Sequence, residues 1–224
     1  SAHAAQPGTA LMRTGKFFRM ILTLAAARDY GLWQLDVRQA FLQATLTEDL
    51  YMRMPPNVSS RNAQGAEMVC KLRKTLYGLK QAAREWSTRL TSELVALGCI
   101  QGTIDTCLYR LDGSEPGEVC YLLVYVDDLV LAYSSEAIRD KVIRHLTERL
   151  PIDDRGELEW VLRLQVTRDR EARAITISQR QYIDQLLENH MAGAEVTKKY
   201  ESPMDDRLEL TGDDSPTVGS PPHA

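Results

Sequence analysis

The stretch YLLVYVDDLVLAY, residues 121–133, decides the fold, because apolar or aromatic residues flank an acidic pair on both sides. A run of this kind is typical of a strand that is buried on both faces. Ionised carboxylates resist transfer from water into such a place. The cost falls if the chain turns there and the carboxylates meet divalent cations. We therefore predict an apolar hairpin with Asp127 and Asp128 at its tip. The alternative is a plain hairpin whose Asp-Asp turn is only solvated.

Asp36 is the candidate for a third carboxylate in the same site. It lies near the end of LWQLDV, residues 32–37, a short apolar strand that could run beside the hairpin. Mg²⁺ prefers carboxylate oxygens, and a two-metal site holds its ions about 3.5–4 Å apart. Two carboxylates on one turn rarely supply enough ligands. We therefore predict that Asp36 completes a phosphoryl-transfer site for two Mg²⁺ or Mn²⁺ ions. Taken alone, Asp36 has the alternative of an ordinary residue at a strand end.

The segment LYGLKQAAREW, residues 76–86, is a candidate phosphate-binding element. A glycine precedes a helix expected over 80–97, in which Lys80 and Arg84 are four residues apart and face the same side. Helix N-termini favour anions, and basic side chains pair with phosphates. The alternative is a solvated basic face with Trp86 in the core.

The rest of the chain alternates between helix-like and strand-like segments. Helices are expected where apolar residues recur every three or four positions, and strands where short apolar runs end in turn residues. The helices fall at 17–30, 80–97, 136–150 and 179–190, the strands at 32–37, 67–72, 107–111, 119–133, 158–167 and 174–177, a turn or short helix at 40–46, and a loop at 55–65. This order predicts an α+β fold with a small antiparallel sheet flanked by helices.

Composition suggests three regions: a frayed lead-in at 1–16, one folded domain at 17–200, and an acidic linker or disordered tail at 201–224. Six acidic residues and one arginine lie in that tail, so the net charge of −4 leaves the body near neutral. A nucleic-acid-binding face is therefore compatible with the composition. No apolar run is long enough to predict a membrane span, and no secretion signal is visible. The four cysteines lack C-x-x-C spacing, which argues against zinc and fits an intracellular protein.

Three motifs resemble the reverse transcriptase of copia-type (Pseudoviridae-like) LTR retrotransposon polyproteins: DVRQAFL at 36–42, LYGLKQ at 76–81 and YVDD at 125–128. Shorter matches at Tyr51-Met52, Pro55-Pro56, Cys70-Lys71-Leu72, Ser178-Gln179 and Tyr182-Ile183 extend the resemblance from about residue 18 to residue 203. It implies a right-hand polymerase with a palm, partial fingers and at most a rudimentary thumb. The implied activity is that of an RNA-directed DNA polymerase, in which a primer 3′-OH attacks the α-phosphate of a deoxynucleotide and releases pyrophosphate.

The resemblance also implies roles for individual residues. Asp36, Asp127 and Asp128 match the catalytic palm carboxylates, and the Val37 carbonyl would join them around two Mg²⁺ or Mn²⁺ ions. Phe41 matches the position that stacks under the sugar and excludes a 2′-OH; without the resemblance, core packing is the alternative. The partners would be an RNA or DNA template with its primer, and deoxynucleoside triphosphates. The remaining expected contacts are Gly78, Lys80 and Gln81 with the nucleotide, and Tyr125, Arg84, Trp160 and Arg163 with primer or template.

The chain departs from the family pattern at several points. No basic Lys-Ala-Arg-Leu-Val-type segment precedes Phe17. Arg163 stands where glycine is usual, and Arg155 stands where an apolar residue is usual. Ala83 replaces a usual proline, which is a mild change. The sequence also stops before an RNase H domain, as expected for a fragment of a polyprotein or a decayed or repurposed copy.

A rival function follows from these departures: a truncated or repurposed, non-catalytic derivative that binds nucleic acid or protein. Another palm-like nucleotidyltransferase, such as a cyclase, would leave the motif at 76–81 unexplained. A copy from an active element is expected in cytoplasmic virus-like particles, and any other copy in the cytoplasm or nucleus. The sequence leaves the oligomeric state open.

Overall fold

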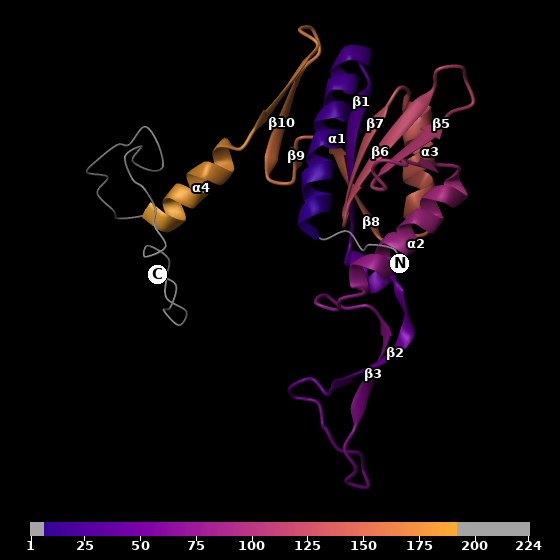
Figure 1. The fold of residues 1–224 in the computed structure, drawn as a ribbon, viewed down its shortest axis with the longest axis vertical. Coiled ribbons are helices and arrows are strands. Elements are labelled where there is room, and N and C mark those ends of the chain that lie inside the picture. Colours follow the sequence, from indigo (N-terminus) through magenta and orange to yellow (C-terminus); the bar gives the residue numbers. More distant parts are fainter. Residues whose placement is uncertain (1–6, 192–224) are drawn as a thin grey trace, which may run out of the picture. The chain divides into compact units, whose positions relative to one another are not determined.

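The computed structural model describes residues 7–191, with side chains from residue 15 to residue 190 (Figure 1). The chain divides into two compact units, Ser1–Gln179 and Arg180–Ala224. The second unit contains α4 (Arg180–Met191). The first unit contains, in chain order, α1 (Pro7–Arg28), β1 (Gly31–Val37), the 3-10 helix η1 (Ala40–Gln43), β2 (Thr45–Arg53), β3 (Val69–Lys74), α2 (Ala82–Leu97), β4 (Ile100–Gln101), β5 (Leu108–Asp112), β6 (Val119–Tyr125), β7 (Asp128–Tyr133), α3 (Glu136–Thr147), β8 (Ile152–Glu157), β9 (Trp160–Val161), β10 (Leu164–Asp169) and β11 (Ala174–Ser178).

A 6-stranded antiparallel sheet, in the order β4-β5-β6-β7-β1-β8, forms the centre of the first unit. The stretch 121–133 folds into the predicted hairpin, in which Tyr125 pairs with Asp128 across a tight turn. β1 lies beside β7, and its register places Asp36 opposite Asp128. The predicted α+β class with antiparallel sheets is therefore confirmed, and the hairpin tip meets the end of β1 at one end of this sheet.

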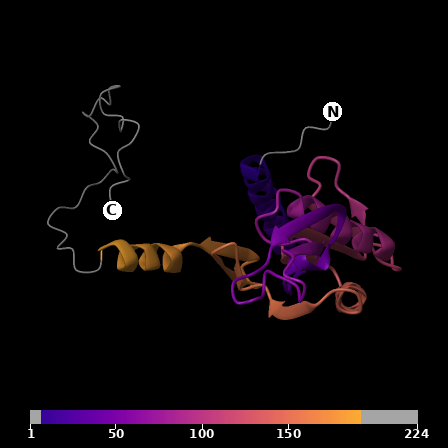
Figure 2. The same cartoon turned by 90° about the horizontal axis from the view of Figure 1, so that it is seen from below.

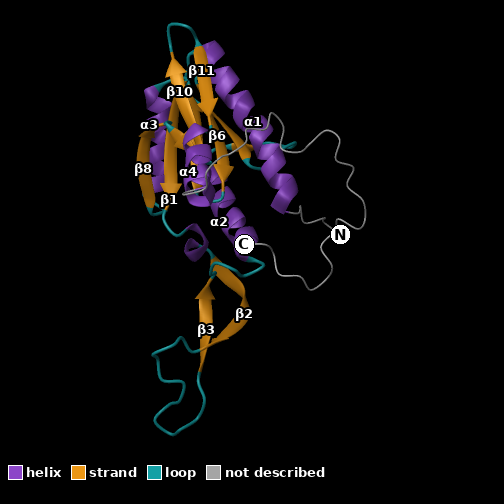
Figure 3. Ribbon diagram, turned by 90° about the vertical axis from the view of Figure 1, so that its left-hand side faces the viewer, coloured by secondary structure: helices purple, strands orange, loops and turns teal. Residues whose placement is uncertain are grey.

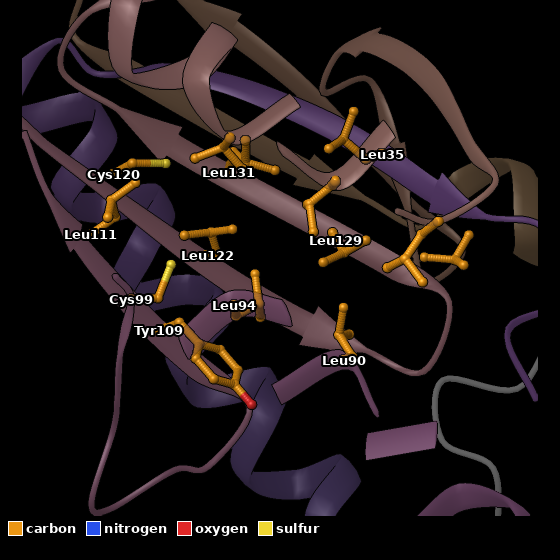
Figure 4. Close-up of a cluster of buried hydrophobic side chains, with 14 of the residues drawn as sticks. Leu35, Leu90, Leu94, Cys99, Tyr109, Leu111, Cys120, Leu122, Leu129 and Leu131 are labelled. Carbon is orange, nitrogen blue, oxygen red and sulfur yellow. The ribbon is translucent and has the colours of Figure 1, made fainter. Parts of the chain in front are cut away.

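Both faces of the central sheet are covered, as the apolar run predicts. Figure 3 shows α1 and α3 on opposite sides of the sheet. Fully burying one leucine side chain contributes about 1.5–3 kcal/mol, so this packing fixes the hairpin in place. On one face, leucines of β6 and β7 meet leucines of α2 (Figure 4): Leu122, Leu129, Leu131, Leu90 and Leu94. Alternate residues of the same strands join α1 in the cluster on the other face: Leu123, Val130 and Ala132.

α1 begins at Pro7 and not at the expected Phe17, so residues 7–16 of the expected lead-in are helical. Proline is favourable in the first helical turn, because the N–H that it lacks would have no partner there. Residues 1–6 lie outside the described residues. The helix ends before Asp29, which takes the left-handed conformation with φ of 54°. Arg168 of β10 holds this end, because its guanidinium pairs with Asp29 at 2.8 Å and donates to the Tyr30 carbonyl.

Two smaller sheets complete the first unit. β2 and β3 pair as an antiparallel hairpin that projects from the end of the central sheet and faces the viewer in Figure 2. β9, β10 and β11 form a 3-stranded sheet. The sequence did not predict β2 or β8. β2 is largely exposed and β8 reads IDDRGE, so neither shows a buried apolar run. Both become strands because β3 and β1 pair with them.

The fourth predicted helix is confirmed as α4, shifted by one residue at each end. Ile183, Leu186 and Leu187 are exposed apolar residues on it. The tail expected at 201–224 lies outside the described residues. Among the described helices, none combines the length and apolar character that crossing a membrane requires.

Candidate active site

Three carboxylates lie at one end of the central sheet. Asp36 of β1 and Asp128 of β7 are direct register partners, and Asp127 occupies the turn before Asp128. The Val37 N–H donates to the Asp127 carbonyl at 2.9 Å, which ties the turn to β1. Gln34 lies two residues before Asp36, and therefore on the same face of β1. Its amide donates to Asp128 Oδ1 at 3.0 Å, so β1 also orients the second carboxylate.

The turn that carries Asp127 has a strained backbone. Val126 has a φ of 56°, in the left-handed region that β-branched residues rarely adopt. Trp86 of α2 is buried and donates its Nε1–H to the Val126 carbonyl at 2.6 Å. Strain of this kind costs about 1–3 kcal/mol and persists where the surrounding contacts over-determine it. Trp86 from α2 and Val37 from β1 supply those contacts.

Asp128 has the electrostatics of a crowded acidic site. Its pKa is raised above the ordinary 3.8, first because burial penalises the charged form, and also because the charges of Asp127 and Asp36 lie close by. The hydrogen bond from Gln34 and the charge of Arg155 act in the opposite direction and lower the pKa, but less than burial and the neighbouring carboxylates raise it. A cation among the three carboxylates would relieve their repulsion. The donor set, which is all carboxylate oxygen, suits a hard cation such as Mg²⁺.

Arg155 of β8 lies against the same carboxylates. Its guanidinium pairs with Asp36 Oδ2 at 3.1 Å and approaches Asp153 Oδ2 at 3.9 Å. Arg38 also pairs with Asp153, at 3.3 Å. Within the part of the chain that the structure describes, no group of three or more His, Cys, Asp or Glu side chains is arranged to hold a metal ion. The residue types therefore fit a divalent cation, while Arg155 takes one of the oxygens that such an ion would use.

Two open cavities flank Asp36. Asp36 lines both of them, so each gives access to this carboxylate from a different side. The larger, of about 550 Å³, is lined by Asp36, Val37, Arg38, Gln39, Gln43, Asp127 and Pro151. The other, of about 370 Å³, is lined by Gln34, Asp36, Asp128, Arg155, Glu157, Glu159 and Trp160.

Phe41, the expected sugar-stacking residue, lies in η1 and is half-buried. Its ring makes an edge-to-face contact with Tyr77, with the ring centroids 4.8 Å apart. The buried Thr75 hydroxyl donates to the Phe41 carbonyl. Two residues of one segment therefore hold Phe41. The nearby Gln81 side chain donates to Glu48 of β2 at 3.3 Å.

The predicted basic helix start is corrected by the structure. α2 begins at Ala82, so Lys80 precedes the helix and does not share a helical face with Arg84. Residues 79–82 form a turn instead, in which the Ala82 N–H donates to the Leu79 carbonyl at 3.1 Å, and helical bonding begins with the Glu85 N–H and the Gln81 carbonyl. Lys80 and Arg84 are both exposed, and Arg84 pairs with the adjacent Glu85 at 3.0 Å.

The four expected primer and template residues lie in different parts of the first unit, and Arg84 is the one in α2. Tyr125 ends β6, directly before the carboxylate turn. Trp160 of β9 is 39% exposed and shares a cavity with Asp128. Arg163 and its neighbour Leu162 form the β9–β10 turn with φ values of 63° and 51°. Since glycine is the residue that adopts such angles without strain, the turn explains why Arg163 is an unfavourable replacement for it.

Three contacts of this site were not predicted from the sequence: those of Gln34 with Asp128, of Arg155 with Asp36, and of the Trp86 indole with Val126. The spacing of Gln34 from Asp36 is the signal that would have found the first, because side chains two apart in a strand share a face. The contacts of Trp86 and Arg155 depend on how α2 and β8 pack, which no local pattern reports.

The sequence belongs to a known class of protein. The family described as Reverse transcriptase (RNA-dependent DNA polymerase) matches residues 11–204. The chain is therefore a member of the reverse transcriptase family. The resemblance to the reverse transcriptase of copia-type retrotransposon polyproteins is confirmed by individual relatives as well.

The chain is similar to several transposon proteins. It is 37% identical over 169 residues to the retrovirus-related Pol polyprotein from transposon RE1 of Arabidopsis thaliana, which covers 75% of this chain and 11% of that polyprotein. It is 34% identical over 201 residues to the corresponding polyprotein from transposon TNT 1-94 of Nicotiana tabacum, covering 89% of this chain and 15% of the relative. It is 34% identical over 150 residues to the putative transposon Ty5-1 protein of Saccharomyces cerevisiae, and the match covers 66% of this chain and 47% of the yeast protein. The chain thus spans a small part of the Pol polyproteins and less than half of the yeast protein.

Proposed function

We propose that this chain is the polymerase core of a copia-type RNA-directed DNA polymerase, with a right-hand palm and partial fingers. Its substrates are deoxynucleoside triphosphates and a primer on an RNA or DNA template. The observation that carries the proposal is the register pairing of Asp36 with Asp128, next to Asp127, at an accessible end of the sheet. Membership of the reverse transcriptase family supports it.

Asp36, Asp127 and Asp128, with the Val37 carbonyl, are the proposed ligands of two Mg²⁺ or Mn²⁺ ions. When bound, such ions activate the attacking oxygen and steady the leaving oxygen. The contribution of the protein is positional. β1 and the β6–β7 hairpin hold the carboxylates before any substrate arrives, so little rearrangement is needed at the moment of reaction. Gln34 fixes the orientation of Asp128 by its hydrogen bond.

Phe41 is the proposed selector of deoxynucleotides. Its bulk would exclude a 2′-OH by steric contact, and a ring that is held in place does this better than a mobile one. Tyr77 contacts this ring edge-to-face, and Thr75 holds the Phe41 backbone through its carbonyl. The further proposed contacts are Gly78, Lys80 and Gln81 with the incoming nucleotide, and Tyr125, Arg84, Trp160 and Arg163 with primer and template.

The substitution Asp127→Asn tests the site. We expect it to lower the extension of oligo(dT) on poly(rA), with Mg²⁺ or Mn²⁺, by at least about 10²-fold, because a neutral amide holds a cation poorly. Circular dichroism should show an unchanged fold. The control is Asp112→Asn, at the opposite end of the β5–β6 pair, where the carboxylate contacts Arg110 at 2.7 Å. Extension at the wild-type rate by the Asp127 variant would refute the site assignment.

A second candidate is a non-catalytic derivative that binds nucleic acid. Two observations favour it: Arg155 lies against Asp36, and Arg163 holds a turn that suits glycine. The same experiment separates the two functions. The non-catalytic derivative is favoured if the wild-type chain fails to extend a primer with either metal, while the wild type and Asp127→Asn bind a labelled primer–template duplex equally well.

A further inference from the structure

Arg155 enters the carboxylate site through a local irregularity of β8. In the β1–β8 pair, Gln34 is opposite Gly156 and Leu35 is opposite Asp154, so Arg155 has no opposite residue of its own. This two-against-one arrangement is a β-bulge, which bends the strand and re-aims a side chain. The bulged residue is the one whose guanidinium reaches Asp36 at 3.1 Å.

Arg155 and a divalent cation would compete for the same carboxylate. An arginine is charged at every accessible pH, so its attraction to Asp36 persists wherever the carboxylate is ionised. The ion pair uses Asp36 Oδ2, and a divalent cation held by Asp36 would need oxygen atoms of the same carboxylate. The positive charge also opposes the approach of another cation into the cavity that Arg155 lines together with Asp36 and Asp128.

The side chain of Arg155 is also able to leave. It is 55% exposed, so its release from Asp36 does not open the core. A second acid is already close, because Asp153 Oδ2 lies 3.9 Å from the same guanidinium nitrogen. Glu157 and Glu159 line the same cavity. Arg155 can therefore exchange Asp36 for another carboxylate at little cost in electrostatic energy.

We infer that Arg155 is a built-in counter-ion of the carboxylate site: it holds Asp36 until a divalent cation arrives, and its release sets the cation concentration at which the site fills. This inference rests on the proposed function, which places the cations at Asp36. It predicts that the charge of Arg155 weakens cation binding, and that the charge of Arg110, which pairs with Asp112 at 2.7 Å and lines neither cavity at Asp36, does so much less.

The test is Mn²⁺ binding by the full chain, followed by electron paramagnetic resonance and calorimetry without nucleotide or primer. Arg155→Leu should bind Mn²⁺ about threefold to fivefold more tightly than the wild type, the factor that corresponds to an exposed ion pair of about 0.7–1 kcal/mol. Arg155→Lys, which keeps the charge and guards against misfolding of the leucine variant, should bind close to the wild-type affinity. Arg110→Leu is the matched control for loss of one surface cation, because the Arg110 side chain is 54% exposed, and it should change the affinity by less than twofold.

The outcomes distinguish this inference from the function on which it rests. Asp36→Asn should remove the Mn²⁺ binding; if it does not, the cations bind elsewhere, and both the site and the inference fail. If Asp36→Asn removes the binding but Arg155→Leu binds as the wild type does, the site stands and the inference is overturned. An equal gain from Arg110→Leu would also overturn it, because the effect would then be one of general surface charge.

Discussion

The hydrogen bond from Trp86 to Val126 ties the turn that carries Asp127 to α2, so its loss should loosen this turn while the rest of the fold stays intact. Trp86 is only 2% exposed, and its Nε1–H donates to the Val126 carbonyl at 2.6 Å. Trp86→Phe keeps an aromatic ring in the core and removes the donor. The orphaned carbonyl should cost about 1–2 kcal/mol, and the smaller ring about 1 kcal/mol more through the space it leaves. We expect the free energy of unfolding to fall by about 2–3 kcal/mol.

Urea denaturation measures this change, provided that the denaturant dependence of the two proteins is the same. Trp160→Phe is the matched control, because Trp160 is 39% exposed and its truncation should cost less than about 0.5 kcal/mol. Primer extension by Trp86→Phe should fall further than the fraction of unfolded chain explains, since the released turn carries Asp127. If Trp86→Phe loses no more stability than Trp160→Phe and extends primers at the wild-type rate, the indole of Trp86 does not hold the turn.

Two further predictions concern pH and backbone strain. The raised pKa of Asp128 means that the folded state binds the proton of this carboxyl more tightly than the unfolded state does. The stability that the bound proton contributes is present at low pH and is lost as the pH rises above 3.8. In urea unfolding between pH 4 and 7, the wild type should lose stability relative to Asp128→Asn, and a difference that is constant with pH would contradict this. Arg163→Gly should raise the free energy of unfolding by about 0.5 kcal/mol. Glycine relieves the strain at a φ of 63°, and the larger conformational entropy of glycine in the unfolded chain offsets part of this stabilisation. An equal gain from Arg163→Ala would show that the backbone angle is not the cause.

The central hairpin was predictable because its signal is local. An apolar run broken only by Asp127-Asp128 has few ways to bury both faces, and β6 and β7 form as expected. The helices α2, α3 and α4 follow from apolar spacing in the same way, with ends displaced by a few residues. The start of α1 was missed because residues 7–16 are polar and include two glycines, which weaken a helix signal.

The parts that sequence could not predict are those that depend on a distant partner. β8 is polar and becomes a strand only beside β1, and its bulge decides where Arg155 points. The prediction that Lys80 and Arg84 share a helical face failed because residues 79–82 form a turn before α2 begins. Local patterns report burial and turns; they do not report register, and register determines which charges meet at this site.

The placement of β1 between β7 and β8, which both come much later in the chain, also governs the order in which the site is assembled during synthesis. β1 leaves the ribosome before the strands beside it, since Gln34 contacts Asp128, 94 positions later, and Asp36 contacts Arg155, 119 positions later. Contacts so distant in sequence form slowly, because a long loop must close before they stabilise anything. A nascent chain that ends before β7 therefore carries Asp36 on an unpaired strand. The three carboxylates can come together only after β7 has emerged, and Arg155 can join Asp36 only after β8, so the growing chain passes a long interval without the assembled site.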